Sequence, residues 1–510
     1  MSEEKKLDGP DLSQGVKLTD IAEGGMLLGH AGGEAVLLAR SGGEVLAIGA
    51  ECTHYHGPLA EGVRVGDTVR CPWHHACFSL RSGEALRAPA LDPVASWRVE
   101  QRDGTVFVRD KLPPPAAVPR PSSPMRPASV VIIGGGAAGQ AAAEMLRREG
   151  YGGPVTMLSA DPEPPYDRPN LSKDYLAGNA PEEWLPLRPP EFYAEHGIAL
   201  ACDARAAAID LAAKEVRLAD GGRHPWDALL LATGAEPVRL AVPGAELPHV
   251  RTLRSLADCR TLIAMAQGAR RVVVVGASFI GLEVASSLRA RDIDVEIVAP
   301  EALPMEPVFG AEIGRLVRRV HEEHGVAFHL GTNVKSIDAT GLDLQNGERL
   351  QADLIVVGIG VRPRTELAEA AGIAVDHGVV VDASLATNVP GIWAAGDIAR
   401  WPDRLTGQPL RIEHWVVAER QGQVAARNML GRSERFDAAP FFWTQQHDLT
   451  LSYVGQAREW DRIEIDGRIE AKDARLTYWQ GGRKLAVLTI GRDRDSLAAE
   501  IELERQIAAG

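Results

Sequence analysis

Residues 129–139 read Ser-Val-Val-Ile-Ile-Gly-Gly-Gly-Ala-Ala-Gly, and a second strand is expected at Val155–Ser159. The apolar run before the glycines predicts a buried strand, and Gln140–Glu149 after them predicts a helix, which together make a βαβ unit. Glycines at the start of such a helix let backbone amides approach a pyrophosphate, so a dinucleotide site is predicted. The glycines of this turn have the spacing Gly-x-Gly-x-x-Gly, and they are Gly134, Gly136 and Gly139.

The same pattern occurs a second time further along the chain. A strand is expected at Arg271–Val275, a turn at Gly276–Gly281, a helix at Leu282–Arg291 and a strand at Val295–Val298. Ser278 stands where the middle glycine of the fingerprint is usual, and its Cβ lies where the backbone would meet a pyrophosphate. The chain is therefore predicted to hold two nucleotide-binding units in series.

An acidic residue follows each predicted turn at a distance suited to a ribose. Asp161 lies 22 residues after Gly139, and Glu301 lies 20 residues after Gly281. No lysine or arginine occurs from residue 292 to residue 314, so the second site should prefer NADH to NADPH, whose 2′-phosphate needs a cation. The alternative is that Glu301 is a solvated loop charge.

The first hundred residues have a different pattern, with many glycines and short alternating runs. Val36–Ile48 and Trp97–Val108 each predict a β-hairpin, so this part should be a small all-β domain. Residues 113–128 are rich in proline, which cannot donate to a β-ladder and favours extended polyproline II. They are predicted to form a semi-rigid linker.

Within the all-β domain, two segments together carry two cysteines and two histidines. The pattern is Cys-x-His, sixteen residues, then Cys-x-x-His, and the residues are Cys52, His54, Cys71 and His74. Two thiolates and two imidazoles can bind zinc or a [2Fe–2S] cluster that has two histidines on one iron. Cys-x-His is tighter than usual zinc-finger spacing, which favours the cluster.

The composition excludes some functions. Lys and Arg number 55 and Asp and Glu 69, a net charge of −14, which argues against a nucleic-acid partner. The sequence shows neither a secretory signal nor an apolar run long enough to span a bilayer, so we expect a cytoplasmic protein with no membrane partner. There are five cysteines and no Cys-x-x-Cys pair, which argues against a redox disulfide.

The cysteine–histidine pattern, with its Cys-Pro-Trp-His segment at residues 71–74, resembles the Rieske ferredoxin motif. Residues 165–169, 171–173, 227–234 and 387–397 resemble the FAD motifs of the two-dinucleotide-binding flavoproteins, a family that includes ferredoxin reductases of dioxygenases and apoptosis-inducing factors. Over nearly the whole chain the sequence resembles the apoptosis-inducing-factor-like Rieske–FAD oxidoreductases.

This resemblance implies a multidomain fold. A small all-β Rieske domain would precede two doubly wound α/β domains, one for FAD and one for NAD, and an α+β C-terminal domain. The predicted division is a Rieske domain at 1–112, a linker at 113–128, an FAD domain at 129–250 and 381–437, an NAD domain at 251–380 and a C-terminal domain at 438–510.

The resemblance also implies roles for individual residues. Asp161 should meet the adenosine ribose of FAD, Arg168 and Lys173 the pyrophosphate and flavin, and Asp397 the ribityl chain. Lys173 should pair with Glu283 near the flavin, with Trp415 close to the ring, although Trp415 could also be an ordinary packing aromatic. Further expected cofactor contacts are Thr233, Gly234 and Gly396 for FAD, and Gly276, Ser278, Gly281, Glu301 and Gly360 for NAD.

Other residues near the four cluster ligands depart from the Rieske family. His56 and His75 replace glycines, and we interpret them as solvent-facing; the alternative is that their charge tunes the cluster. Gly57 and Trp73 occupy the positions of the extra disulfide of high-potential Rieske proteins, and Ala76 replaces a hydrogen-bonding serine. Fewer donors to the sulfurs should lower the potential. Cys77 is expected to be a small buried residue.

The function implied by the resemblance is that of an NADH-dependent flavoprotein reductase. Electrons would pass from NADH through FAD to the [2Fe–2S] cluster of the same chain, then to an external protein such as an oxygenase or a ferredoxin. The alternative is an NADH-responsive redox sensor of the apoptosis-inducing-factor type with slow turnover. A homodimer is a further option for its assembly.

Overall fold

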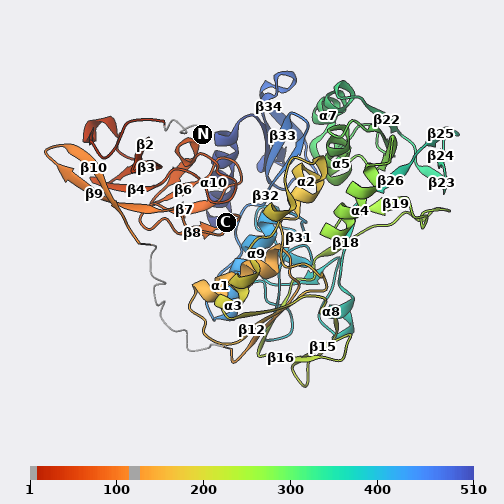
Figure 1. Cartoon of the computed structure of the whole chain (residues 1–510), viewed down its shortest axis with the longest axis horizontal. Helices are drawn as coiled ribbons and strands as arrows, with labels where there is room; N and C mark the ends of the chain where they lie inside the picture. The colour runs from red at the N-terminus through yellow and green to blue at the C-terminus, as the bar shows by residue number, and fades with distance from the viewer. Residues whose placement is uncertain (1–7, 114–126, 510) are drawn as a thin grey trace. The chain divides into compact units, whose positions relative to one another are not determined.

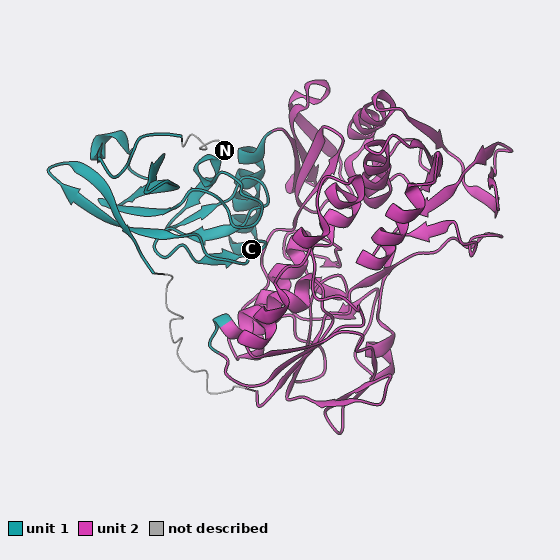
Figure 2. Ribbon diagram, viewed as in Figure 1, with its two compact units in different colours: residues 1–122, 148–150, 492–509 teal, residues 123–147, 151–491, 510 magenta. Residues whose placement is uncertain are grey.

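The computed structural model describes residues 8–113 and 127–509. The chain divides into two compact units, one made of residues 1–122, 148–150 and 492–509 and the other of residues 123–147 and 151–491 (Figure 2). Most of the predicted linker, residues 114–126, lies outside the described residues.

The first unit contains two antiparallel sheets (Figure 1). One has six strands in the order β1 (Val16–Lys17), β10 (Thr105–Lys111), β9 (Ser96–Arg102), β4 (Glu44–Gly49), β3 (Glu34–Ser41) and β2 (Met26–Ala31). The other has four, β5 (Val63–Val65), β6 (Thr68–Arg70), β7 (Cys77–Ser79) and β8 (Ala85–Arg87). Both predicted hairpins are confirmed as β3–β4 and β9–β10.

The first dinucleotide domain is built on a five-stranded parallel sheet. Its strands lie in the order β13 (Ile198–Ala201), β12 (Val155–Leu158), β11 (Val130–Ile133), β17 (Ala228–Leu231) and β29 (Ile392–Ala394). All residues of β11 and β17 are buried, as expected for central strands of a parallel sheet that is covered on both faces. The strand β29 returns from far along the chain, so this domain is discontinuous in sequence.

The second dinucleotide domain repeats this plan. Its parallel sheet has the order β19 (Val250–Thr252), β26 (Leu354–Val357), β20 (Arg271–Val275), β21 (Asp294–Ala299) and β22 (Val326–Leu330). Each domain also carries a small antiparallel sheet. These are β14 (Ala206–Asp210), β15 (Glu215–Leu218) and β16 (Arg223–Pro225) in the first, and β23 (Val334–Asp338), β24 (Gly341–Leu344) and β25 (Arg349–Gln351) in the second.

An antiparallel sheet ends the second unit. Its order is β32 (Phe441–Gln446), β33 (Leu449–Gly455), β36 (Arg483–Ile490), β35 (Asp473–Gln480) and β34 (Arg462–Arg468). Shorter strands are β18 (Ala235–Pro237), β27 (Val361–Pro363), β28 (Val379–Val380), β30 (Ala399–Pro402) and β31 (Pro409–Leu410).

The helices that place functional residues are α1 (Ala137–Arg148), α5 (Phe279–Arg289), α7 (Ala311–Glu323), α9 (Trp415–Met429) and α10 (Asp493–Ala509). The others are α2 (Asp174–Ala177), α3 (Pro190–Glu195), α4 (Leu256–Ala266), α6 (Glu306–Phe309) and α8 (Glu366–Ala370). In the part of the chain that the structure describes, no helix combines the length and apolarity needed to cross a membrane.

The compact units group the helix α10 differently from the division predicted from sequence. The prediction assigned all of residues 438–510 to a C-terminal domain, whereas α10 is grouped with the N-terminal β-sheets. Side chains of α10 form ion pairs with residues that are more than 400 positions earlier in the chain. No local sequence pattern reveals contacts of this kind.

Candidate cluster and flavin sites

The four cysteine and histidine residues lie on two loops with matching backbone geometry. The amide of Cys52 donates to the carbonyl of Gly57 at 2.8 Å, and that of Cys71 donates to Ala76 at 2.8 Å. The amides of His56 and His75 donate back to the carbonyls of Cys52 and Cys71 at 3.0 and 3.2 Å. Each loop therefore presents one sulfur and one imidazole from the same kind of turn.

The donors of the two loops meet as two pairs. His54 Nδ1 lies 3.2 Å from His74 Nδ1, and the buried thiols of Cys52 and Cys71 share a hydrogen bond. That bond lowers the pKa of Cys52 and raises the pKa of Cys71, with burial adding to the rise at Cys71. No three His, Cys, Asp or Glu side chains among the described residues are arranged around one metal ion. One nitrogen pair and one sulfur pair match the donor set of a two-iron cluster with both histidines on one iron.

Contact between the two loops explains one of the family departures. A Cβ on Gly57 would lie 2.7 Å from Cys71 Sγ and 3.2 Å from the Trp73 ring, so only glycine fits there without a shift. Gly57 and Trp73 thus face each other where a disulfide would join the loops in high-potential relatives. All five cysteines are free, and Cys77 is buried as expected.

The two extra histidines differ from each other. His56 has an exposed side chain, as predicted, but the prediction that His75 faces solvent is wrong, because only 1% of His75 is exposed. Both adopt positive φ, +58° and +61°, a region that glycine enters more easily. This explains why glycine is usual at these positions of the family.

A cavity of about 510 Å³ lies at the carboxyl end of the first parallel sheet. Ligands of such sheets bind at this edge. Sequence-predicted residues that line the cavity are Gly134, Gly136, Asp161, Arg168, Thr233 and Gly234. The tyrosine hydroxyl of Tyr166 donates to Asp161 Oδ2 at 2.7 Å, which orients that carboxylate.

The lining of the cavity fits a bound dinucleotide. A Cβ on Gly139 would lie 1.9 Å from the carbonyl oxygen of Gly134, so helix α1 approaches the turn as closely as the fingerprint requires. Arg168 Nε is buried and has no hydrogen-bond partner among the described residues. A phosphate group would satisfy this donor.

Three residues that were predicted to contact FAD are not part of the lining of this cavity, namely Gly396, Asp397 and Trp415. Asp397 Oδ2 accepts a hydrogen bond from Arg254 Nη2 at 2.7 Å, and Arg254 itself lines the cavity. The amide of Gly396 donates to Gln421 Oε1 at 2.8 Å, while the half-buried Trp415 begins α9. Arg254 was missed from the sequence. Its only local signal is the capping box that follows it, Ser255 with Asp258.

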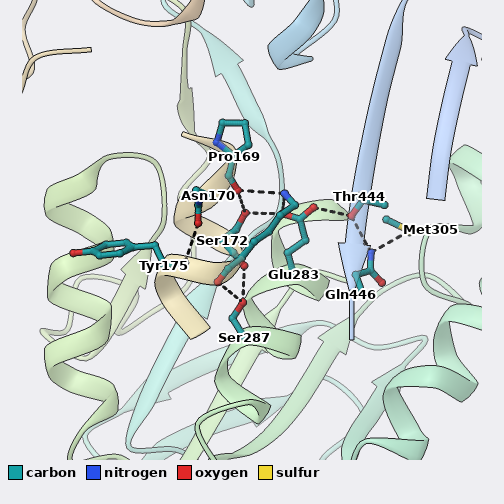
Figure 3. A network of polar contacts seen from close by, with 10 residues as sticks. Pro169, Asn170, Ser172, Tyr175, Glu283, Ser287, Met305, Thr444 and Gln446 are labelled. Atoms are coloured by element: carbon teal, nitrogen blue, oxygen red, sulfur yellow. Dashed lines mark hydrogen bonds and ion pairs between the residues drawn. The ribbon is translucent and has the colours of Figure 1, made fainter. Parts of the chain in front are cut away.

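Lys173 and Glu283 are brought together as expected. Lys173 Nζ lies 2.8 Å from Glu283 Oε2, and the glutamate is buried. Figure 3 shows that Glu283 also receives the hydroxyls of Ser172, at 2.5 Å, and of Thr444, at 2.7 Å. Since three donors surround the carboxylate, its position is fixed, and it holds the ammonium group of Lys173 in turn.

The network continues along β32 beyond Thr444. Gln446 Nε2 donates to Thr444 Oγ1 at 3.2 Å (Figure 3). Gln446 Oε1 lies 3.1 Å from Nε2 of the buried His321 on α7. Burial lowers the pKa of His321 to about 4. Thr444 and Gln446 were not predicted as functional. The available signal in the sequence was that both residues are polar and occupy alternate, inward-facing positions of a buried strand.

The second Gly-rich turn is equally tight. A Cβ on Gly276 would lie 2.4 Å from the carbonyl oxygen of Gly358, and one on Gly281 would lie 2.1 Å from that of Gly276. Ser278 is exposed and is the N-cap residue of α5, so the Cβ that replaces the usual glycine does not prevent the turn. Gly360 has φ +112° and is exposed. Glu301 follows β21 by two residues and is partly exposed.

The comparisons with known proteins agree with this geometry. A model of pyridine nucleotide-disulphide oxidoreductases matches residues 128–422, a Rieske [2Fe–2S] domain model matches residues 15–98, and a reductase C-terminal model matches residues 441–509. The chain belongs to the pyridine nucleotide-disulphide oxidoreductase family. This member of the family carries a Rieske domain at its N-terminus.

Relatives within the family share both halves or the reductase half. Human apoptosis-inducing factor 3 is 34% identical over 93% of this chain and 81% of its own length. The ferredoxin–NAD(+) reductase component of a Burkholderia cepacia anthranilate 1,2-dioxygenase system is 37% identical over 74% of this chain and 94% of its own. The reductase in a covalent putidaredoxin reductase–putidaredoxin complex superposes with a TM-score of 0.72 at 34% identity, over 75% of this chain and 94% of that chain.

Family membership and the site geometry together fix the cofactors. The chain is an FAD-dependent oxidoreductase that uses NADH and carries a Rieske [2Fe–2S] centre. The cavity beside Gly134 and Arg168 suits the dinucleotide part of FAD, and the two loops suit the cluster. The assignment of each predicted residue to a cofactor atom remains a prediction.

Proposed function

We propose that this protein is an NADH-dependent reductase that delivers electrons through its own Rieske centre to an external protein. The observation that carries the proposal is that one chain holds both a paired sulfur and nitrogen donor set and a dinucleotide cavity. A Lys173–Glu283 ion pair accompanies the cavity, and Lys173 follows the cavity residue Arg168 closely in sequence. Bound FAD accepts a hydride and releases electrons singly, and a [2Fe–2S] cluster carries one electron at a time.

The polypeptide supplies binding and electrostatics for this chemistry. We assign the pyrophosphate to Gly134, Gly136 and the unpartnered Nε of Arg168. Lys173, held by Glu283, places a positive charge where the reduced flavin gains a negative one. The adenosine ribose is assigned to Asp161 and the ribityl chain to Asp397, which Arg254 holds in place. The cluster ligands are assigned as Cys52, His54, Cys71 and His74.

The external acceptor is proposed to be an oxygenase component or a ferredoxin. Two of the relatives reported above are named for such partnerships, one as part of a dioxygenase system and one in complex with putidaredoxin. The acidic surface charge of −14 favours an acceptor with a basic face. A homodimeric assembly stays a prediction.

Two electron acceptors distinguish this function from that of a slow redox sensor. Both acceptors take one electron at a time. Ferricyanide is a small ion that can take electrons from the flavin directly, whereas cytochrome c is a protein that we expect to be reduced by the cluster. His74→Ala should keep NADH-driven ferricyanide reduction and lose at least about nine-tenths of cytochrome c reduction, while His56→Ala, in the other loop, should keep both.

Equal loss of both activities in His74→Ala would contradict the route through the cluster. Wild-type turnover slower than about one per minute with both acceptors, together with a long-lived NADH-bound flavin spectrum, would favour the sensor.

A further inference from the structure

The last helix, α10, contacts the second of the two cluster loops through buried charges. It belongs to the same compact unit as the N-terminal sheets, although the reductase C-terminal model includes it in residues 441–509. Figure 2 shows both in one colour. Residues of α10 and of the β5–β6 hairpin also line one groove, among them Ala498, Ile501, Val63 and Val65.

Arg70 is the first point of contact. It is the last residue of β6, directly before the cluster ligand Cys71, and it is buried. Its Nη1 donates to Glu500 Oε2 at 2.6 Å and its Nη2 donates to Glu504 Oε2 at 2.7 Å. The guanidinium thus bridges two carboxylates on successive turns of α10, which fixes the strand end from which Cys71 emerges.

Glu504 extends the contact to β8, the edge strand of the same sheet. Its Oε1 accepts a hydrogen bond from Arg87 Nη2 on β8 at 2.7 Å. Glu500 is fully buried, and Arg70 is the cation that compensates its charge. Without Glu500, Arg70 would keep only Glu504 as a partner.

His75 is the second point of contact and follows the ligand His74. Its Nδ1 lies 3.3 Å from Glu500 Oε2 and its Nε2 lies 3.2 Å from the hydroxyl of Ser496. Its backbone has φ +61°, a conformation that residues other than glycine rarely adopt. The hydrogen bond at Nε2 and the nearby Glu500 carboxylate, at ion-pair distance from Nδ1, hold the residue there.

His56, the residue of the first cluster loop that is equivalent to His75, has a looser contact among the described residues, since its Nδ1 lies 3.7 Å from Glu51 Oε2. The two share the same backbone hydrogen bond and nearly the same φ, but the side chain of His56 is 81% exposed. Of the two histidines that follow the predicted cluster ligands, His75 is the one whose described side-chain contacts are with α10.

We propose that α10 is part of the cluster site, with Glu500, Glu504 and Ser496 as positioning residues that hold the Cys71–His74 loop through Arg70 and His75. This inference rests on the assignment of Cys52, His54, Cys71 and His74 as cluster ligands. The C-terminal end of the reductase thereby determines how firmly the N-terminal cluster is held. Arg70 and Glu500 are 430 residues apart in sequence.

The test compares Glu500→Gln with Arg505→Gln, a control that removes a charge from an exposed position of the same helix. In Glu500→Gln, the Rieske absorption should decay at least about tenfold faster under a chelator, and the midpoint potential of the remaining cluster should become more positive, because a nearby negative charge is lost. Flavin content and NADH-driven flavin reduction should match wild type. Arg505→Gln should behave as wild type in all four measurements.

A second pair of variants tests the loop contact itself. His75→Gly removes the α10 contacts but relieves the backbone, whereas His56→Gly relieves the backbone alone. His75→Gly should shorten cluster lifetime and shift the EPR g-values, and His56→Gly should change neither.

The inference is overturned if Glu500→Gln equals Arg505→Gln in cluster lifetime and potential, or if the two glycine variants behave alike. A wild-type protein that binds flavin yet takes up no Rieske cluster would instead overturn the ligand assignment.

Discussion

Glu283 is the residue on which the flavin-side hydrogen bonds converge, from Lys173, Ser172 and Thr444. The pairing with Lys173 could be predicted because a family motif named both partners. The contact with Thr444 could not be predicted, because Thr444 lies 161 residues from Glu283 and belongs to β32 of the last sheet, whereas Glu283 lies on α5. His75 is a second residue whose surroundings could not be predicted from its neighbours in sequence. Its neighbours in sequence suggested a solvent-facing loop, whereas the residues that bury it belong to the far end of the chain.

Replacing Glu283 should therefore impair flavin reduction. Glu283→Gln keeps the shape but removes the charge that holds Lys173, so NADH should reduce the flavin about tenfold more slowly, as expected for loss of about 1.4 kcal/mol of transition-state stabilisation. Stopped-flow absorbance measures this rate. Thr444→Val, which removes one neutral hydrogen bond, should slow it less. An unchanged rate in Glu283→Gln would exclude a role for the pair.

A second residue-scale prediction concerns the choice of nicotinamide. NADH should be preferred in kcat/KM, and Glu301→Ala should reduce the preference, because the carboxylate repels a 2′-phosphate and accepts from a 2′-hydroxyl. Asp292→Ala, on the opposite side of β21 in sequence, is the matched control and should leave the ratio unchanged. A wild-type preference for NADPH would refute the cofactor choice; an unchanged ratio in Glu301→Ala would refute only the role of Glu301.

At the scale of elements, both βαβ units could be predicted because their signals are local. The helices begin at Ala137 and Phe279, three residues earlier than the predicted starts at Gln140 and Leu282, since the glycine turn passes directly into helical backbone. The contact of α10 with β6 and β8 could not be predicted, because nothing in an amphipathic helix identifies the sheet against which its charges will pair.

The packing of α7 against β32 leads to a prediction about pH. His321 is fully buried and its pKa is about 4, compared with about 6.5 in an unfolded chain. Below pH 6.5 the unfolded state binds the extra proton, so stability should fall as the pH drops towards 4, by about 3 kcal/mol in total from this group.

The variant His321→Gln keeps a donor for Gln446 but cannot titrate. The decrease in the Tm of flavin release between pH 6.5 and pH 4 should be smaller in this variant than in wild type. His377→Gln, at an exposed loop position, serves as the control and should retain the wild-type slope. Identical slopes in wild type and His321→Gln would show that this histidine does not contribute.

At the scale of the whole molecule, one chain combines the domains that bind two kinds of electron carrier, a flavin and an iron–sulfur cluster. The Rieske module and the two dinucleotide domains could each be predicted from local motifs, and the family comparisons agree with both. The placement of the last helix with the N-terminal sheets was the part that sequence reasoning did not provide. Fusion keeps donor and acceptor at high effective concentration, which is the physical advantage of a covalent link.

The central claim is that electrons from NADH reach the cluster through the flavin of the same protein. Anaerobic mixing with one equivalent of NADH, followed by freeze-quenching and EPR, tests it most directly. The flavin absorbance should bleach first, and a Rieske signal should then grow to about one spin per chain, since the cluster accepts one electron. A flavin that bleaches fully while the cluster stays oxidised, in a sample whose cluster dithionite reduces, would contradict the account.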